Sequence, residues 1–331
     1  MGAVVSATTG IEWTATVHPD GSVTPGKTWN PVRGCSIVSP GCVNCYAMKQ
    51  AHRFSGTGKP YDGLTKQTSA GPQWAGHAME IDSMLTEPLS WRTPCRVFVN
   101  SMSDLFHPSV TDAFIDRVFG MMACAPQHTF QILTKRADRM LSWARSRNHQ
   151  HIHEAAKHVL GFDHPKRRGL NSGDWPLPNV WLGVSVENQK FADERIPLLL
   201  QTPAAVRFIS AEPLLGPVDL VRGGWTFLEA LRPPPGNSGG HERGLDWVIV
   251  GGESGPKARQ CERGWVRSIV HQCKAAGVAV FVKQLGSTPY EGEKPYMEMT
   301  IGARRIVLRD RKGGDPSEWP EDIRVREFPR V

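Results

Sequence analysis

The chain has 331 residues, of which 40% are hydrophobic, and a formal net charge of +7 at pH 7. This length can bury a sizeable core, and we expect one domain with insertions. No run approaches the roughly 20 apolar residues of a membrane span, and the first residues lack the pattern of a secretory signal, so we expect a cytoplasmic protein without a membrane partner.

Short apolar runs rich in β-branched residues recur along the chain. They lie at 96–100, 129–133, 180–186, 206–209, 247–250 and 278–282, with a seventh candidate at 28–32. Each run is too short for a helix and lacks alternation, which is typical of strands buried on both faces. Helical patterns follow at 111–123, 137–145, 189–200 and 262–276, and Thr111 is the expected N-cap of the first. This alternation predicts an α/β fold with parallel strands, as a partial or full (β/α) barrel; an open doubly wound sheet is the alternative.

Two stretches and a tail interrupt this rhythm. Residues 147–178 are rich in His, Arg, Gly and Pro, and 223–244 contain PPPGNSGG. We interpret both as surface insertions or flexible loops of a barrel domain spanning 1–289. Residues 290–331 carry a basic run at 304–312 and are expected to form a basic appendage packed on the barrel. Four histidines lie within 149–158, and their polar surroundings favour an exposed helix start, so we assign them no role.

Three of the seven cysteines lie on one Gly- and Pro-containing loop, GCSIVSPGCVNCYA, at Cys35, Cys42 and Cys45. Thiolates are the usual ligands of iron–sulfur clusters, and three ligands on a four-iron cluster leave one iron open. We therefore expect a [4Fe-4S] cluster whose open iron is chelated by S-adenosyl-L-methionine, which the reduced cluster would cleave to a 5′-deoxyadenosyl radical. A structural zinc completed by His52 or Cys95 is the alternative.

Polar residues follow the predicted strands, where an α/β barrel carries its reactive groups. Asn100, Ser101 and Ser103 are candidates for the methionine end of the cofactor, and Glu187 or Glu212 for its amino group or ribose hydroxyls. Gly251 and Gly252 permit either close approach of a ligand or a tight turn. The remaining candidates are Asp104 and Asn188 for cofactor binding, and Lys135, Lys283 and Glu253 for catalysis, the two lysines meeting a substrate carboxylate or phosphate.

The triplet resembles that of the radical S-adenosylmethionine superfamily, which has an aromatic residue beside the last cysteine. This chain departs from that pattern by a longer first gap and by having Asn44 before Cys45 and Tyr46 after it. Over nearly its full length the chain is similar to a phage- and prophage-associated family of uncharacterised radical-enzyme relatives. The matching segments include TWNPVRGCSIVSPGCVNCYA, VFVNSMSDLFH, FQILTKR, ISAEPLLGP and WVIVGGESG. The resemblance implies a barrel-like radical enzyme that holds its cofactor near Tyr46. It also implies that spore photoproduct lyase is a more distant relative.

The positive charge and the 11 tryptophans are compatible with a nucleic-acid base or nucleotide as substrate. The phage association favours that hypothesis by analogy, and modification or repair of a base would be the reaction. Cluster chemistry also implies an electron donor of the flavodoxin or ferredoxin type. Two alternatives stay open, a radical enzyme acting on a peptide or small metabolite, and a non-catalytic zinc-stabilised nucleic-acid-binding protein.

Overall fold

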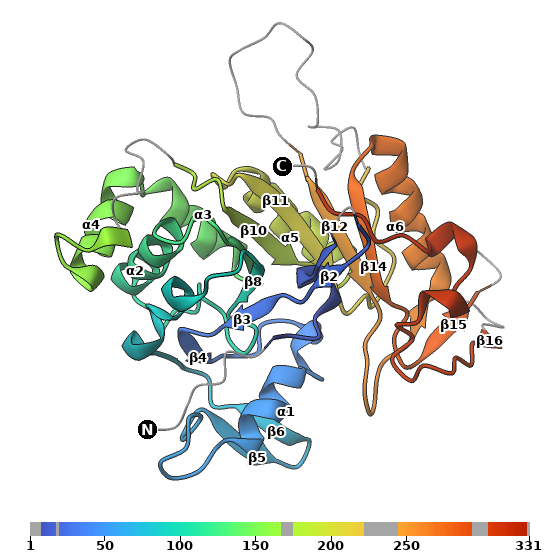
Figure 1. Ribbon diagram of the computed structural model, residues 1–331. Coiled ribbons are helices and arrows are strands. Elements are labelled where there is room, and N and C mark those ends of the chain that lie inside the picture. The colour runs from blue at the N-terminus through green and yellow to red at the C-terminus, as the bar shows by residue number, and fades with distance from the viewer. Residues whose placement is uncertain (1–7, 18–19, 167–174, 222–243, 293–303, 330–331) are drawn as a thin grey trace, which may run out of the picture. The chain divides into compact units, whose positions relative to one another are not determined.

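The computed structural model describes residues 8–17, 20–166, 175–221, 244–292 and 304–329 (Figure 1). The chain divides into two compact units. The first contains residues 1–182 and 202–205, and the second contains residues 183–201 and 206–331. We describe each unit by itself.

Seven strands form one sheet in the order β14-β12-β11-β10-β9-β8-β3. Their bounds are β3 (Lys27–Trp29), β8 (Arg96–Val99), β9 (Thr129–Thr134), β10 (Val180–Ser185), β11 (Val206–Ala211), β12 (Trp247–Gly251) and β14 (Ala279–Gln284). The pairs β3–β8, β8–β9, β11–β12 and β12–β14 are parallel. The order follows the chain and lacks the reversal that defines a doubly wound sheet. The α/β class and the parallel strands are therefore confirmed, and the topology is compatible with a partial barrel.

In the first unit, three helices follow β8 and β9: α2 (Asp112–Ala123), α3 (Ala137–Arg145) and α4 (His149–Leu160), which lie together in Figure 1. The predicted N-cap is confirmed, because Thr111 Oγ1 accepts a hydrogen bond from Phe114 N at 3.2 Å. Phe119 of α2 and Trp143 of α3 pack with ring centroids 4.3 Å apart. Helix α4 lies inside the predicted insertion 147–178 and begins at the histidine-rich segment, as that segment's composition indicated.

Between β3 and β8 the chain forms a small lobe that the sequence patterns did not predict. Strand β4 (Val32–Gly34) pairs antiparallel with β7 (Ala78–Glu80), and α1 (Tyr46–Arg53) packs on the hairpin of β5 (Thr65–Thr68) and β6 (Gly71–Trp74) (Figure 1). Ala47, Met48, Ala51, Tyr61, Leu64 and Trp74 form its buried apolar cluster. A further hairpin, β1 (Thr16–Val17) with β2 (Val23–Thr24), precedes β3.

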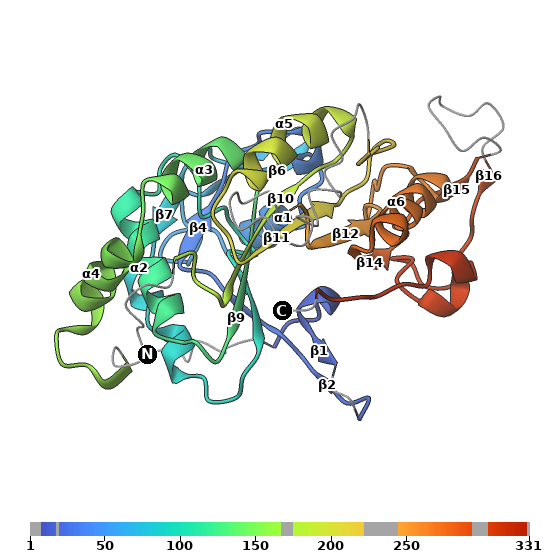
Figure 2. The same ribbon diagram turned by 90° about the horizontal axis from the view of Figure 1, so that it is seen from above.

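In the second unit, α5 (Gln189–Leu200) precedes β11, and α6 (Arg263–Ala276) lies beside β14 in both views (Figures 1 and 2). A small sheet has the order β13-β15-β16, with β13 (Cys261–Glu262), β15 (Pro289–Glu291) and β16 (Arg304–Arg305).

The described part of the predicted C-terminal appendage packs against β14. Val282 N donates to Val325 O at 2.8 Å, and Glu327 N donates to Val280 O at 2.9 Å. The side chain of Trp319 is 1% exposed. The predicted insertion at 223–244 lies, except for its last residue, outside the described residues. Among the helices that the structure describes, none combines the length and apolar character needed to cross a membrane.

Candidate functional site

The cysteine loop begins where β4 ends and finishes where α1 begins. Gly34, the last residue of β4, has φ +86°, and a Cβ there would lie 2.6 Å from His77 O, so glycine is required at this turn. Cys42 N donates to Ser39 O at 3.0 Å and Cys45 N to Cys42 O at 3.2 Å. These short-range bonds fold residues 39–45 into consecutive tight turns that carry Cys42 and Cys45.

The thiols are half-buried and act on one another electrostatically. Burial, followed by the negative charge of Asp104, raises the pKa of Cys35 to about 12, with a smaller contribution from Cys45. Burial also raises the pKa of Cys45, and Cys42 contributes in the same direction. Cys35 and Cys45 pack against the apolar cluster of the lobe. The three cysteines therefore share one partly dehydrated environment.

A guanidinium group lies beside Cys35. Arg136, between β9 and α3, donates through Nη1 to Cys35 Sγ at 3.9 Å and to Asp104 Oδ2 at 2.6 Å. Its Nη2 donates to Ser36 Oγ at 2.8 Å. Burial disfavours the charged guanidinium, but Asp104 and Cys35 raise the pKa of Arg136 above its usual value. A permanent positive charge therefore faces the first cysteine of the loop.

Asp104 and His107 hold this arginine and its serine partner from the segment after β8. Asp104 Oδ1 accepts hydrogen bonds from Thr134 Oγ1 at 2.8 Å and from Phe106 N at 3.0 Å. Burial, followed by Arg136, lowers the pKa of His107 to about 4, so the imidazole is neutral near pH 7. His107 Nδ1 accepts from the backbone of Ser109, which leaves the proton on Nε2, 3.0 Å from Ser36 Oγ.

The predicted cofactor residues at the end of β8 are brought beside the strand that leads into the cysteine loop. Asn100 Oδ1 accepts from Val32 N at 3.3 Å, and Ser103 Oγ donates to Val32 O at 2.7 Å. Ser101 Oγ donates to Asn30 Oδ1 at 3.2 Å. Asn100 also has a left-handed backbone, with φ 59°. These polar side chains therefore attach the end of β8 to the segment before Cys35.

Three further features concern residues of the first unit that were expected from the sequence to be functional. Tyr46 is 59% exposed, and its hydroxyl donates to Ser101 O at 2.7 Å. The charge of Lys135 lowers the pKa of Cys45, which places the lysine near the loop. Asn100 Nδ2 is buried and has no hydrogen-bond partner among the described residues. Such a buried donor requires an explanation, and an absent ligand is one.

The other predicted residues lie in the second unit. Lys283 Nζ and Glu212 Oε1 form an ion pair at 2.7 Å, and Gln284 Nε2 donates to the same oxygen at 3.3 Å. A Cβ on Gly251 would lie 3.6 Å from Glu212 Cδ, whereas one on Gly252 would lie 2.2 Å from the backbone oxygen of Leu285. The absent side chain of Gly252 therefore serves close backbone packing, and Gly251 lines the ion pair.

Three predicted residues of this unit have partners inside the protein. Glu187 is fully buried and pairs with Arg195 at 3.1 Å. Asn188 is the N-cap of α5, where its Oδ1 accepts from Phe191 N. Glu253 pairs with Arg259 through both of its carboxylate oxygens.

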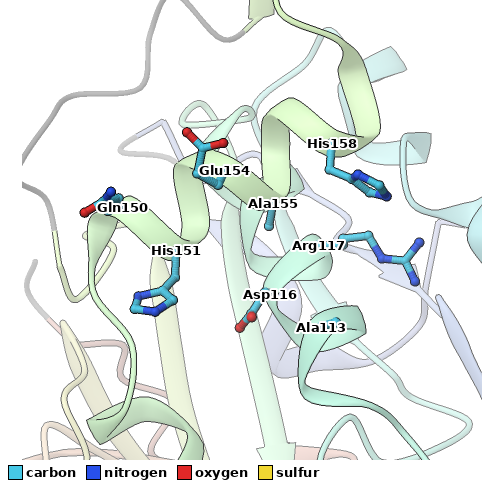
Figure 3. Close-up of a pocket in the computed structure, with 8 residues that line it drawn as sticks. All are labelled: Ala113, Asp116, Arg117, Gln150, His151, Glu154, Ala155 and His158. Carbon is cyan, nitrogen blue, oxygen red and sulfur yellow. The ribbon is translucent and has the colours of Figure 1, made fainter.

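A surface hollow of the first unit lies between α2 and α4 (Figure 3). Asp116 and Arg117 of α2 face His151, Glu154 and His158 of α4 across it. None of the residues expected from the sequence to be functional lines this hollow.

Sequence reasoning gave no specific role to three members of the cysteine environment: Ser36, His107 and Arg136. Arg136 follows Lys135 directly after a predicted strand, so its position was a usable signal. Its partner Asp104 was predicted, but pairing across 32 residues depends on the fold. Within the described ranges, no three His, Cys, Asp or Glu side chains are already gathered as a metal-binding group.

A family model described as "Protein of unknown function (DUF5131)" matches residues 8–311. The match spans most of the chain, so the chain belongs to this family. Among curated proteins and among solved structures, none matches it.

Proposed function

We propose that this protein is a radical S-adenosylmethionine enzyme in which Cys35, Cys42 and Cys45 bind a [4Fe-4S] cluster. The observation that carries the proposal is the grouping of these thiols on one loop, with the Arg136 guanidinium donating to Cys35 Sγ. The charge of Arg136 lowers the pKa of Cys35 against the larger effects of burial and Asp104, which raise it to about 12. The guanidinium therefore acts in favour of the thiolate, which is the form that binds iron.

The donor set fits such a cluster. Three thiolates bind three irons and leave the fourth open to S-adenosylmethionine, to which the reduced cluster supplies the cleaving electron. Cys35, Cys45 and Met102 pack against the apolar cluster that contains Met48. The grouping is looser than a finished metal site, so cluster binding would draw the thiols closer together.

The zinc alternative requires a fourth ligand, and neither candidate is gathered with the triplet among the described residues. His52 Nδ1 lies 3.0 Å from Thr65 Oγ1, which leaves Nε2 as its remaining ring nitrogen. Cys95 is 7% exposed, and its Sγ lies 3.5 Å from His128 Nδ1. Cys95 also precedes β8, whereas the loop packs at the other end of that strand, roughly 13 Å away at 3.3 Å per residue. Neither residue supports a four-coordinate zinc with the triplet.

The chain's own residues suit binding and orientation of the cofactor. Asn100 Nδ2 is a buried donor beside the loop and would hydrogen-bond the cofactor. Tyr46 presents an exposed ring at the last cysteine. The Lys283–Glu212 pair offers an ammonium group that a substrate carboxylate or phosphate would attract.

A nucleic acid or nucleotide is the substrate class that the charge of residues 46–74 favours. In this part of the small lobe the exposed basic side chains are Lys49, Arg53, Lys59 and Lys66, and the single acidic residue is Asp62. These residues begin directly after Cys45, so a phosphate backbone attracted to them would lie near the cluster loop.

Anaerobic reconstitution tests the chemistry. We expect about four irons per chain and formation of 5′-deoxyadenosine from S-adenosylmethionine with a strong reductant. Cys35→Ala, Cys42→Ala and Cys45→Ala should each lose both, whereas Cys124→Ala, a buried thiol of the same unit, should retain them. An intact cluster without cofactor cleavage, or zinc in place of iron, would overturn the proposal.

Substrate class is tested by binding and by isotope transfer. The double variant Lys49→Glu/Arg53→Glu should weaken binding of a single-stranded oligonucleotide in a salt-dependent manner, and the exposed pair Lys190→Glu/Lys274→Glu serves as the charge-matched control. Deuterium should pass between a labelled oligonucleotide and 5′-deoxyadenosine. Equal oligonucleotide binding by both double variants, with no isotope transfer, would exclude a nucleic-acid substrate and favour a peptide or small metabolite.

A further inference from the structure

Arg136 is the best-defined group beside the cysteine loop, and its contacts extend beyond Cys35 to Asp104 and Ser36. Its side chain is 8% exposed and makes contacts on both sides. On one side, Nη1 meets Asp104 at 2.6 Å; on the other, Nη1 and Nη2 reach Cys35 Sγ at 3.9 Å and Ser36 Oγ at 2.8 Å. This planar fork joins the β8 and β9 ends to the start of the loop.

The direction of the guanidinium is determined by groups that do not belong to the loop. Asp104, itself held by Thr134 Oγ1 and Phe106 N, accepts from Arg136. Thr134 Oγ1 accepts from the backbone N of Arg136 at 2.9 Å, which anchors the residue at its main chain as well. His107 Nε2 supports Ser36 from another direction. The arginine is therefore oriented toward Cys35 before any cluster binds.

We infer that Arg136 is a positioning residue of the cluster site, which orients Cys35 and donates a charge-assisted hydrogen bond to its ligating sulfur. This inference rests on the proposed function. A donor and a positive charge at a ligating sulfur stabilise the reduced cluster, which carries one more negative charge. Groups that hold metal ligands also contribute to retention of the metal, typically by about 10–100-fold. Lysine cannot reproduce the fork, because it is a point charge on a flexible stem.

The test compares reconstituted wild-type protein with Arg136→Gln, Arg136→Lys and the control Arg147→Gln. Arg147 is a half-buried arginine of the same unit that pairs with Asp116 and lies outside the loop's contacts. We expect Arg136→Gln to release iron to a chelator about tenfold faster and to shift the cluster's reduction potential to a more negative value. Arg136→Lys should have an iron-release rate and a reduction potential between those of the wild type and Arg136→Gln. Arg147→Gln should match the wild type in both.

Arg136→Gln also leaves Asp104 as a buried, unpaired carboxylate, so the protein could lose its fold. The double variant Asp104→Asn/Arg136→Gln removes both charges, so it should keep the fold and still lose iron faster. Its potential should lie above that of Arg136→Gln, because the negative charge of Asp104 opposes that of Arg136 at Cys35. A merely structural role for Arg136 would not move the potential of a folded, cluster-loaded variant.

The outcomes separate the two proposals. If the wild-type protein takes up no iron, the proposed function fails and this inference fails with it. If the wild type carries a cluster but the folded double variant releases iron at the wild-type rate, and Arg136→Lys has the wild-type potential, the role of Arg136 alone is overturned.

Discussion

Replacing either partner of the ion pair between Glu187 and Arg195 should lower the unfolding free energy of the second unit substantially. The two side chains are 0% and 3% exposed, with Oε2 and Nη1 3.1 Å apart. Arg195 Nη1 also donates to Ser185 O at 2.7 Å. Glu187→Met would leave the arginine charged and unpaired in the core, and Arg195→Met would do the same to the glutamate.

The magnitude follows from the cost of an uncompensated buried charge. Breaking one partner of such a pair typically costs about 3–5 kcal/mol of unfolding free energy. Arg195 Nε has no hydrogen-bond partner among the described residues, so the native pair is itself incompletely compensated. The double variant Glu187→Met/Arg195→Met removes both charges with little change in volume. It should recover most of the loss, because apolar replacement of a whole buried pair is often neutral or stabilising.

Urea unfolding of the wild type, both single variants and the double variant gives the coupling free energy as a double-mutant cycle. At about 2–4 °C per kcal/mol, each single variant should also lower the melting temperature by roughly 10 °C. Single variants that lose less than about 1 kcal/mol, or a double variant as unstable as the sum of the singles, would refute the reasoning. If the folded double variant no longer binds S-adenosylmethionine, the expectation from the sequence that Glu187 is a cofactor ligand would be supported instead.

Two further predictions follow from local geometry and charge. Gly252→Ala should lower the unfolding free energy by about 1–3 kcal/mol, because the new Cβ would lie 2.2 Å from Leu285 O. Gly264→Ala in α6, where a Cβ would meet nothing within 4 Å, should raise the unfolding free energy by up to about 1 kcal/mol. Equal urea midpoints for the two variants would contradict this contrast. The pKa of His107 is lowered to about 4 in the folded protein, below its value near 6.5 in the unfolded chain. Between these two pH values the unfolded chain therefore binds more protons than the folded one. The unfolding free energy should fall by up to about 3 kcal/mol as the pH drops from about 6.5 to 4. His107→Asn should flatten this dependence in urea titrations across that range, and an unchanged slope would exclude the histidine as its source.

The strands and helices of the sheet could be predicted because their signals are local. The runs at 96–100 and 247–250 are short, apolar and β-branched, and burial on both faces of a parallel sheet requires that composition. Thr111 was recognisable as a cap because its hydroxyl bonds only three residues along the chain. The lobe between β3 and β8 escaped prediction, since its strands are short and its core depends on packing of α1 over the β5–β6 hairpin.

The candidate site was predictable only in part. The cysteine triplet is a local motif, and polar residues at strand ends follow from the parallel topology. The roles of single residues were not accessible: Glu187, expected as a cofactor ligand, pairs with Arg195, and Asn188 caps α5. Arg136, to which the sequence analysis assigned no role, lies against Cys35.

The amino-acid sequence by itself determined the α/β class, the positions of the main-sheet strands and of the helices between them, and the grouping of three thiols on one loop, because each depends on neighbouring residues. Only the tertiary structure decided which charges meet. Asp104 and Arg136, 32 residues apart, pair beside Cys35 because β8 and β9 are adjacent parallel strands whose carboxyl ends lie side by side. Sequence spacing does not encode that proximity; hydrogen-bond register between strands does.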